Sequence, residues 1–355
     1  METKRIDFVD LAKGICILLV VIFHLDFTYS CHLPYSLMST YFRMPLYFIL
    51  SGLFFKDYGG FKYFLVKKTN KLAIPYIFFY ILNILLFPFI LYFLFPSLYN
   101  QPVVGLDYFF CFYYEESNHM PDAIWFLLCL FILNLIFYGI FAISKHIADF
   151  IKTKNNSSNL IISSLVILSA ILGGIGYYLG VNRINLNLYF DSALTVVPFF
   201  CFGFLLRKYT NVLYPNRYDK YNFLFIIISF IIIRLLYQDL LSYRQNKFDV
   251  SFLSLYLTGI IGSVSILFIA KYIKRMPIVS YIGRYSIVTL CTHQPIIVFM
   301  NILFKTLNAN ISAFLQLLIT FVVIVILEVY VIVPFMIKFM PHVTAQKDIL
   351  KLAQA

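Results

Sequence analysis

Residues 7–26 read DFVDLAKGICILLVVIFHLD, and this stretch decides the class of fold. It is almost continuously apolar, and about 20 such residues cross the hydrocarbon core of a bilayer as one α-helix. Asp7 and Asp10 lie in its first turns, and Asp26 ends it without a small-residue cleavage site, which is unlike a cleaved signal peptide. The stretch therefore predicts a transmembrane helix near the N-terminus.

The composition of the whole chain extends this reading to a polytopic protein. Its 355 residues are 61% hydrophobic and 12% charged, and the mean hydropathy is +0.86. A soluble domain is about 45–50% apolar and about 25% charged. So little charge cannot cover a surface in water, so the chain is expected to be an integral membrane protein. Its apolar runs are longer than the 9–11 alternating residues of a barrel strand, which favours helices.

Ten stretches of the chain are long enough and apolar enough to be counted as spans. The sequence thus predicts an all-α membrane protein, a bundle of about ten transmembrane helices in one domain over residues 1–340, with a short tail over 341–355. The predicted spans are 7–26, 41–55, 73–95, 124–143, 159–180, 190–206, 222–238, 251–270, 285–304 and 313–337.

The net charge of +12 is explained by topology rather than by nucleic acid. Lysine and arginine accumulate in cytoplasmic loops, and no basic run outside the spans has the aromatic interleaving of a single-strand binder. Placing both termini in the cytoplasm leaves only six of the 28 basic residues outside. These six are Arg43, Arg183, Arg234, Arg244, Lys247 and Lys305.

Ionisable residues inside spans are costly and are therefore candidates for function. Lys13 and His24 are 11 positions apart, which puts them on one helix face about 16 Å apart along the axis. Asp10, one turn before Lys13, is placed to pair with it. The alternative is structural: an interfacial Asp10–Lys13 pair, with His24 capping the helix.

Other polar residues lie near the ends of predicted spans or at similar depths within them. Arg43 and Trp125 open predicted spans on the external side, where snorkelling and an aromatic belt are the structural alternatives. His293 follows Arg284 by nine residues, and Glu328 lies nine residues before the end of the last span. Both are therefore expected about 13 Å in from the cytoplasmic boundary. A channel, a proton-coupled transporter and a transferase acting across a membrane remain open at this point.

The six cysteines show no CxxC pair and no metal-ligand spacing, so no metal site is expected. Four of them lie inside predicted spans, where a small hydrophobic side chain is the default role. Cys31 and Cys111 share the external side, so a disulfide between them is an open alternative to two free thiols.

Several motifs, in order along the chain, resemble the membrane acyltransferase-3 family. The first is a basic residue, ten others and a histidine in the first span, matched by Lys13 and His24. The loop before the third span, usually with two arginines three apart, is matched by Lys68 and Lys71. The motif-bearing segments are Arg5–Gly14, Val20–His24, Met44–Gly52, Lys67–Tyr76, Ala123–Leu127, Asp191–Leu194, Pro198–Gly203, Ile282–Ser286 and His293–Pro295.

This resemblance implies a bacterial O-acyltransferase, usually an O-acetyltransferase, in its short stand-alone form. It implies cytoplasmic acetyl-CoA, or another acyl-CoA, as co-substrate, with no permanently bound cofactor. Lys68 and Lys71 are expected to bind the CoA phosphates, more loosely than arginines because lysine lacks the bidentate fork. The resemblance also implies a multi-pass protein of the bacterial cytoplasmic membrane.

The same resemblance implies roles around the first span. His24 is expected to be the general base, and Lys13 to orient the donor or stabilise developing charge. Arg43 and Trp125 are expected to bind the acceptor. Ser51 has two readings, a covalent acyl carrier or a small residue for helix packing.

The expected partners are the lipid bilayer and an envelope polysaccharide or lipid-linked glycan, and no nucleic acid. Homo-oligomers or polysaccharide-assembly proteins are compatible partners. The competing hypothesis is a proton-coupled glycan transporter or flippase without transferase chemistry, in which His24, His293 and Glu328 form a proton relay.

Overall fold

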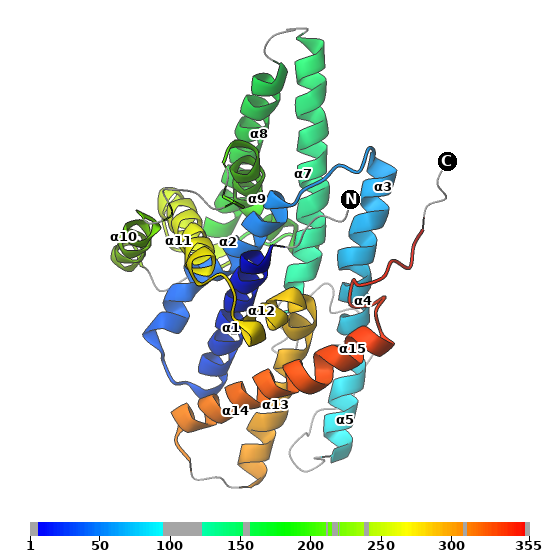
Figure 1. The fold of residues 1–355 in the computed structure, drawn as a ribbon, viewed down its shortest axis with the longest axis vertical. Coiled ribbons are helices and arrows are strands. Elements are labelled where there is room, and N and C mark those ends of the chain that lie inside the picture. The colour runs from blue at the N-terminus through cyan, green and yellow to red at the C-terminus, as the bar shows by residue number, and fades with distance from the viewer. Residues whose placement is uncertain are drawn as a thin grey trace.

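The computed structural model describes residues 6–94, 123–151, 157–210, 212–214, 219, 221–237, 241–307 and 311–351. Apart from one small hairpin, the described regular structure is helical (Figure 1). Its elements are α1 (Asp7–Tyr29), α2 (Pro34–Leu53), α3 (Phe61–Lys68), η1 (Thr69–Ala73), α4 (Ile74–Ile81), η2 (Leu82–Leu86), α5 (Phe87–Leu94), α7 (Trp125–Phe150), α8 (Ser157–Val181), η3 (Asn187–Tyr189), α9 (Phe190–Tyr209), α10 (Asn222–Leu235), β1 (Leu241–Ser242), β2 (Lys247–Phe248), α11 (Phe252–Ile273), α12 (Pro277–Arg284), α13 (Ser286–Thr306), α14 (Ala313–Leu327), η5 (Glu328–Ile332) and α15 (Val333–Phe339).

The predicted all-α membrane class is confirmed, and seven of the ten predicted spans correspond to helices long and apolar enough to cross a bilayer. The other three predicted spans are also helical, but they differ in hydropathy, in length or in continuity. α2 has 20 residues but a lower hydropathy, α10 has only 14 residues, and α3 to α5 form a run divided by two π-helical segments. The seven are Asp7–Tyr29, Trp125–Phe150, Ser158–Val181, Asn187–Tyr209, Phe252–Ile273, Ser286–Thr306 and Ala313–Phe339.

Lys56 to Leu72 connects the predicted spans 41–55 and 73–95 and is therefore expected to be a loop, but most of it is helical. Gly59 and Gly60 have φ values of 76° and 156°, which glycine adopts without strain. Helix α3 then begins at Phe61 and runs without a break through η1 into α4. No helix breaker stands between Phe61 and Ile74, so the helix forms before the apolar stretch begins. The connection between the predicted spans 73–95 and 124–143 lies almost wholly outside the described residues, as does Cys111.

Two pairs of glycines allow helices to cross at backbone contact. A Cβ on Gly14 would lie 2.0 Å from the Val279 carbonyl oxygen, and one on Gly283 would lie 1.9 Å from the Asp10 carbonyl oxygen. These values describe the α1–α12 crossing. At the α2–α9 crossing, Gly52 and Gly203 have equivalent distances of 1.9 and 2.0 Å. Only a residue without a side chain fits such contacts, and small residues serve this purpose in membrane bundles.

Prolines inside helices leave carbonyls that other side chains satisfy. Pro295 in α13 has no N–H for the Cys291 carbonyl one turn earlier. The side-chain amide of Asn83, in the π-helical segment η2, donates to that carbonyl at 2.9 Å. The bend at Pro295 is therefore tied to α4–α5, and it lies one residue after Gln294.

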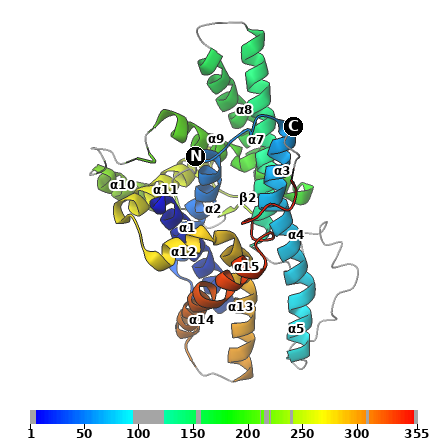
Figure 2. The same cartoon turned by 45° about the vertical axis from the view of Figure 1, so that its right-hand side comes forward.

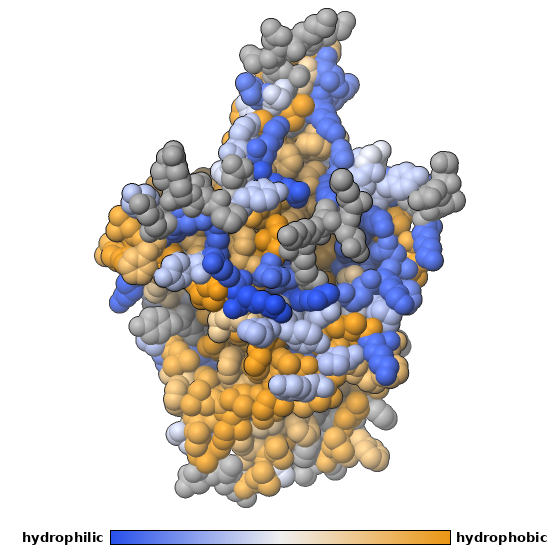
Figure 3. Space-filling model, in the orientation of Figure 1, coloured by the Kyte–Doolittle hydropathy of each residue, from blue (hydrophilic) through white to orange (hydrophobic). Residues whose placement is uncertain are grey.

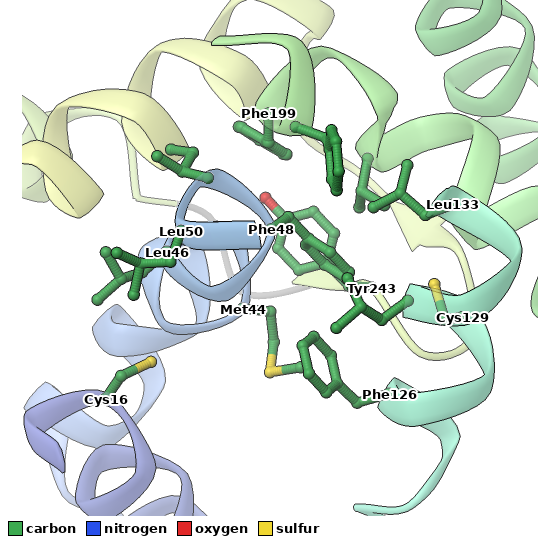
Figure 4. Close-up of a cluster of buried hydrophobic side chains, with 14 of the residues drawn as sticks. Cys16, Met44, Leu46, Phe48, Leu50, Phe126, Cys129, Leu133, Phe199 and Tyr243 are labelled. Carbon is green, nitrogen blue, oxygen red and sulfur yellow. The ribbon is translucent and has the colours of Figure 1, made fainter. Parts of the chain in front are cut away.

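A hairpin between α10 and α11 folds into the bundle. β1 and β2 pair antiparallel, and Asn246 in the turn has a φ of 47°. Its amide donates to the Gly176 carbonyl at 3.0 Å and accepts from the Thr195 hydroxyl at 2.8 Å. Figure 4 shows Tyr243 of the hairpin inside a cluster of side chains from α2, α7 and α9. The hairpin is thus part of the core.

The surface separates an apolar end from a polar band. In Figure 3 the lower part of the visible face, over α13 and α14, is largely hydrophobic, and a hydrophilic band crosses above it. α7 and α8 project together beyond the rest of the bundle (Figures 1 and 2). The C-terminal segment lies along α3 and α4 in Figure 2. This segment contacts Asn70, as the next subsection describes.

Candidate active site

One continuous helix carries the two residues of the predicted basic–histidine motif. α1 runs from Asp7 to Tyr29 without interruption, so Lys13 and His24 share a face and stand about 16 Å apart along its axis. α12 and α13 run beside it. His24 comes ten positions after Gly14, and His293 comes ten positions after Gly283. Since Gly14 contacts Gly283, His24 and His293 also lie next to each other, further along α1 and α13.

The His24 ring is held by two residues of α13. Its centroid is 5.3 Å from that of His293, and Nδ1 of His24 is 3.3 Å from Nε2 of Gln294. In this arrangement Nδ1 accepts, and the ring proton of neutral His24 is on Nε2. A half-turn of the carboxamide would present its oxygen to an Nδ1–H and leave Nε2 with a free lone pair. Gln294 can therefore hold either tautomer.

His293 is completely buried, with a defined tautomer. Its Nδ1 donates to the Thr289 carbonyl at 2.8 Å, so Nε2 carries the lone pair when the ring is neutral. That Nε2 is buried and has no hydrogen-bond partner among the described residues. A buried polar atom of this kind is uncommon and marks a place where a ligand or proton can be received.

Glu328 lies behind His293, where two threonine hydroxyls hold its carboxyl group. Thr289 donates to one oxygen at 3.1 Å, and Thr292 donates to the other. Glu328 is fully buried and begins the π-helical segment η5. Single π-turns of this type are frequent at functional sites. Glu328 is joined to α13 within one turn of His293, and His293 lies beside His24, so the three residues lie at a common level.

Arg43 completes this group from α2. It is only 5% exposed, its Cζ lies 3.6 Å from the centre of the Phe23 ring, and Nη1 donates to Ser39 at 3.2 Å. The aromatic face and the hydroxyl hold the guanidinium beside His24. The sequence placed Arg43 and His24 toward the same side, and the structure brings their side chains into one group.

Arg244 also acts electrostatically on His24, although the sequence assigned it only to an external loop. Arg43 and His293 also act on this ring. The Arg244 carbonyl accepts a hydrogen bond from Ser192 of α9 at 3.3 Å. No motif in the sequence connects position 244 to the first span. The hairpin, which has no helical or barrel periodicity, makes this contact through tertiary packing alone.

The other end of the α1 face has its own basic group. Nζ of Lys13 lies 6.0 Å from the Phe54 ring centre, and Cζ of Arg207 lies 5.6 Å from the same centre. Tyr47 donates to the Lys13 carbonyl at 3.1 Å. Phe54 therefore gathers two cations at the end of α2. The predicted pairing of Asp10 with Lys13 stays a prediction.

The lysines predicted to bind the donor lie on α3 and η1. Lys68 precedes the apolar stretch 73–95, and burial together with the neighbouring Lys71 lowers its pKa to about 8. Asn70 between them is buried and bonds to the C-terminal segment. Its carbonyl oxygen accepts from the backbone N–H groups of Ile349 and Leu350 at 2.9 Å each. The tail thus covers one side of this helix.

Trp125 begins α7 and packs in an aromatic group. Its ring centroid is 5.8 Å from that of Tyr189 and 6.3 Å from that of Phe126. Phe126 in turn lies 5.4 Å from Tyr47, whose hydroxyl reaches α1. Ser51 is partly buried beside Gly52 at the α2–α9 crossing. Within the described residues, no three His, Cys, Asp or Glu side chains form a group that could hold a metal ion.

The structure thus brings His24, Arg43, His293 and Glu328 into one cluster, called here the histidine cluster together with Gln294 and Arg244. Lys13 lies at the other end of α1, Lys68 and Lys71 lie on a separate helix, and Trp125 belongs to a neighbouring aromatic group. Sequence reasoning missed Gln294, Arg244 and Arg207. Gln294 had a signal, since it lies between His293 and Pro295 in a motif, but Arg207 and Arg244 had none.

Comparison with known proteins supplies the family. The model of the acyltransferase-3 family, described as an acyltransferase domain, matches residues 6–333. No curated protein and no solved structure matches the chain. The match covers every helix that contributes to the histidine cluster. The chain belongs to the acyltransferase-3 family of membrane acyltransferases.

Proposed function

We propose that this membrane acyltransferase moves an acyl group, most simply acetyl, from cytoplasmic acyl-CoA to a hydroxyl of an envelope glycan. The proposed location is the bacterial cytoplasmic membrane. The observation that carries the proposal is the histidine cluster, in which His24 shares a helix face with Lys13 and is held by Gln294. A general base, a residue that selects its tautomer and nearby cations are the parts that acyl transfer requires.

In the proposed transfer step, the glycan hydroxyl oxygen attacks the thioester carbonyl carbon. The hydroxyl proton passes to Nε2 of His24, the carbon–sulfur bond breaks, and CoA leaves as a thiolate that is then protonated. With the Gln294 carboxamide turned by half a rotation, its oxygen would accept from Nδ1–H, and Nε2 would begin the step unprotonated. The cations nearest His24 stabilise the negative charge that develops on the carbonyl oxygen.

The donor and the base approach from opposite ends of α1. Lys68 and Lys71 would bind the CoA phosphates as point charges, and Lys13 with Arg207 would hold the arm of the donor near Phe54. Trp125, with Tyr189 beside it, offers an aromatic face on which a sugar ring can stack. Arg43 would bind a polar group of the acceptor.

About 16 Å separates the Lys13 and His24 levels, which allows two routes. The arm of the donor reaches His24 directly, or an acyl-enzyme carries the acetyl group between levels, with His24 or Ser51 as the carrier. Incubation with labelled acetyl-CoA and no acceptor separates them. Label that stays on the denatured protein supports the carrier route, and its loss in Ser51→Ala would identify the serine.

The main test uses membranes containing the protein, the envelope glycan and labelled acetyl-CoA. His24→Ala should lower label transfer into glycan by about 10²-fold or more, the usual contribution of a general base. Gln294→Leu should lower kcat and alter the pH profile, because the tautomer of His24 is no longer held. His146→Ala is the matched control, since His146 is exposed on α7.

Two results would contradict this proposal. A well-inserted His24→Ala variant that transfers label at the wild-type rate would remove the general base from the proposal. A wild-type protein that moves glycan across vesicle membranes without releasing CoA would be a transporter.

A further inference from the structure

Helix α13 contains one turn whose geometry its own backbone does not fix. Pro295 has no N–H to donate to the Cys291 carbonyl, and His293 and Gln294 lie between these two residues. A proline inside a helix removes a backbone hydrogen bond and allows the helix to kink. The direction in which α13 presents His293 and Gln294 therefore depends on the group that bonds to the open carbonyl.

Asn83 supplies this group from another helix. Its side-chain amide donates to the Cys291 carbonyl oxygen at 2.9 Å, and the residue is only 8% exposed. It is the only polar residue of the sequence between positions 81 and 91. Burying an amide in such apolar surroundings is costly unless the amide is hydrogen-bonded. Asparagine also joins membrane helices for stability alone, and a test has to exclude that alternative.

The backbone on both helices that contact this turn of α13 is π-helical. Asn83 lies in η2, where the backbone bonds span five residues instead of four. A turn of this kind takes one extra residue, so it changes which side chains the helix presents to its neighbours. The second π-turn, η5, begins at Glu328, which is bonded to Thr289 and Thr292 of α13. Two turns of a type frequent at functional sites thus contact α13 around His293.

The contact between Gln294 and His24 is the one most sensitive to this turn. Nε2 of Gln294 lies 3.3 Å from Nδ1 of His24, at the long end of hydrogen-bond distances, so a shift of about 0.5 Å would break it. Gln294 immediately precedes Pro295, and a change in the bend therefore moves it directly. Without the Asn83 amide, the buried Cys291 carbonyl loses a donor, which is unfavourable and favours a different bend.

We propose that Asn83 is a positioning residue for acyl transfer. It acts through the Cys291 carbonyl on the bend of α13, and so on the Gln294 side chain that holds the His24 ring. The proposal rests on the acyltransferase function proposed above and adds to it a residue that touches neither substrate nor base.

The experiment measures label transfer from labelled acetyl-CoA to envelope glycan in membranes, with rates expressed per inserted protein. Asn83→Ala and Asn83→Leu both remove the donor, and leucine keeps the volume of the side chain. Each should lower kcat about 10-fold or more, because small misplacements near the reacting groups are costly. Asn134→Ala is the matched control. Asn134 is also a fully buried asparagine in a membrane helix, but its amide donates to Leu130 of its own helix at 2.7 Å.

Pro295→Ala gives the decisive comparison, because alanine restores the N–H that the Cys291 carbonyl lacks. If Asn83 acts by bonding to that carbonyl, Asn83→Ala should change kcat by less than about twofold in the Pro295→Ala background, a coupling that independent sites do not show. Should Pro295→Ala by itself transfer no label, Asn83→Leu decides the question, since it removes the donor and keeps the volume.

Two further readouts separate positioning from a purely structural role. Lys71 lies 12 positions before Asn83, about 18 Å along the helix, so the KM for acetyl-CoA should keep its wild-type value. The pH profile of kcat should change in the same sense as in Gln294→Leu, because both variants release the same nitrogen of His24.

Several results would overturn the proposal while leaving the acyltransferase function intact. Wild-type kcat in Asn83→Leu would show that the donor is not needed, and an equal loss in Asn134→Ala would assign the effect to general packing. A full loss from Asn83→Ala in the Pro295→Ala background, or a raised KM with unchanged kcat, would also contradict it. If wild-type protein transfers no label at all, the proposed function itself fails.

Discussion

Replacing Gly283 by alanine tests whether the α1–α12 crossing sets the position of the histidine cluster. The new Cβ would lie 1.9 Å from the Asp10 carbonyl oxygen and 2.4 Å from the Gly14 backbone nitrogen. Ordinary contact begins near 3.4 Å, so the two helices must separate by about 1.5 Å at this level. The obstacle is backbone on both sides, so rotating a side chain cannot relieve it.

This separation affects stability and chemistry together. Overpacking of this kind costs about 1–3 kcal/mol. His293 lies ten residues beyond Gly283, on the helix that follows α12, and a misplacement of about 1 Å at a catalytic group can lower a rate about 10²-fold. We therefore expect Gly283→Ala to lower the melting temperature of the solubilised protein and to lower kcat for acetyl transfer about 10²-fold.

The matched control is Gly139→Ala in α7, where a Cβ would have no atom within 4 Å. This variant should transfer acetyl at the wild-type rate and melt at or slightly above the wild-type temperature, because alanine favours helix over glycine. The assays are label transfer in membranes and thermal unfolding in detergent. Wild-type kcat and melting in Gly283→Ala would refute the reasoning that the glycine crossing positions the cluster.

Two further predictions concern the helix formed by α3 and η1. The lowered pKa of Lys68, about 8, means that its ammonium is charged below that pH and neutral above it, so the KM for acetyl-CoA should rise between pH 7 and pH 9. Lys68→Arg should remove this rise, since arginine stays protonated, and an identical rise in Lys68→Arg would assign it to another group. Asn70→Ala removes three hydrogen bonds to the backbone of residues 349–350, so trypsin should cleave after Lys347 faster than in wild type. Unchanged cleavage would show that the tail is held by other contacts.

Sequence patterns were sufficient for local structure and for one helix face. Hydropathy predicted the helical membrane class, because a span must satisfy its backbone within itself. The spacing of Lys13 and His24 predicted a shared face, since α-helical geometry is regular over 11 residues. The same reasoning is wrong for Lys56 to Leu72: a charged stretch between two apolar runs predicts a loop, but nothing in 61–73 ends a helix.

Depth along the chain was harder to predict than helix content. The depth of His293 is predicted from its nine positions after Arg284, which assumes one unbroken helix. Tyr285 separates the short helix α12 from α13, so this assumption does not hold. Which helix lies next to α1 follows from the backbone contact of Gly14 with Gly283. A glycine permits such contact, but the sequence does not name its partner.

By itself, the sequence determined that the chain is helical and membrane-embedded, and that Lys13 and His24 face the same way. These properties depend on hydropathy and on the repeat of one helix, which neighbouring residues specify. The tertiary structure decided that His293, Gln294 and Arg43 lie around His24, and that Arg244 acts on it electrostatically. They come from three other segments of the chain, and only glycine crossings, proline bends and the buried hairpin bring those segments to a common level.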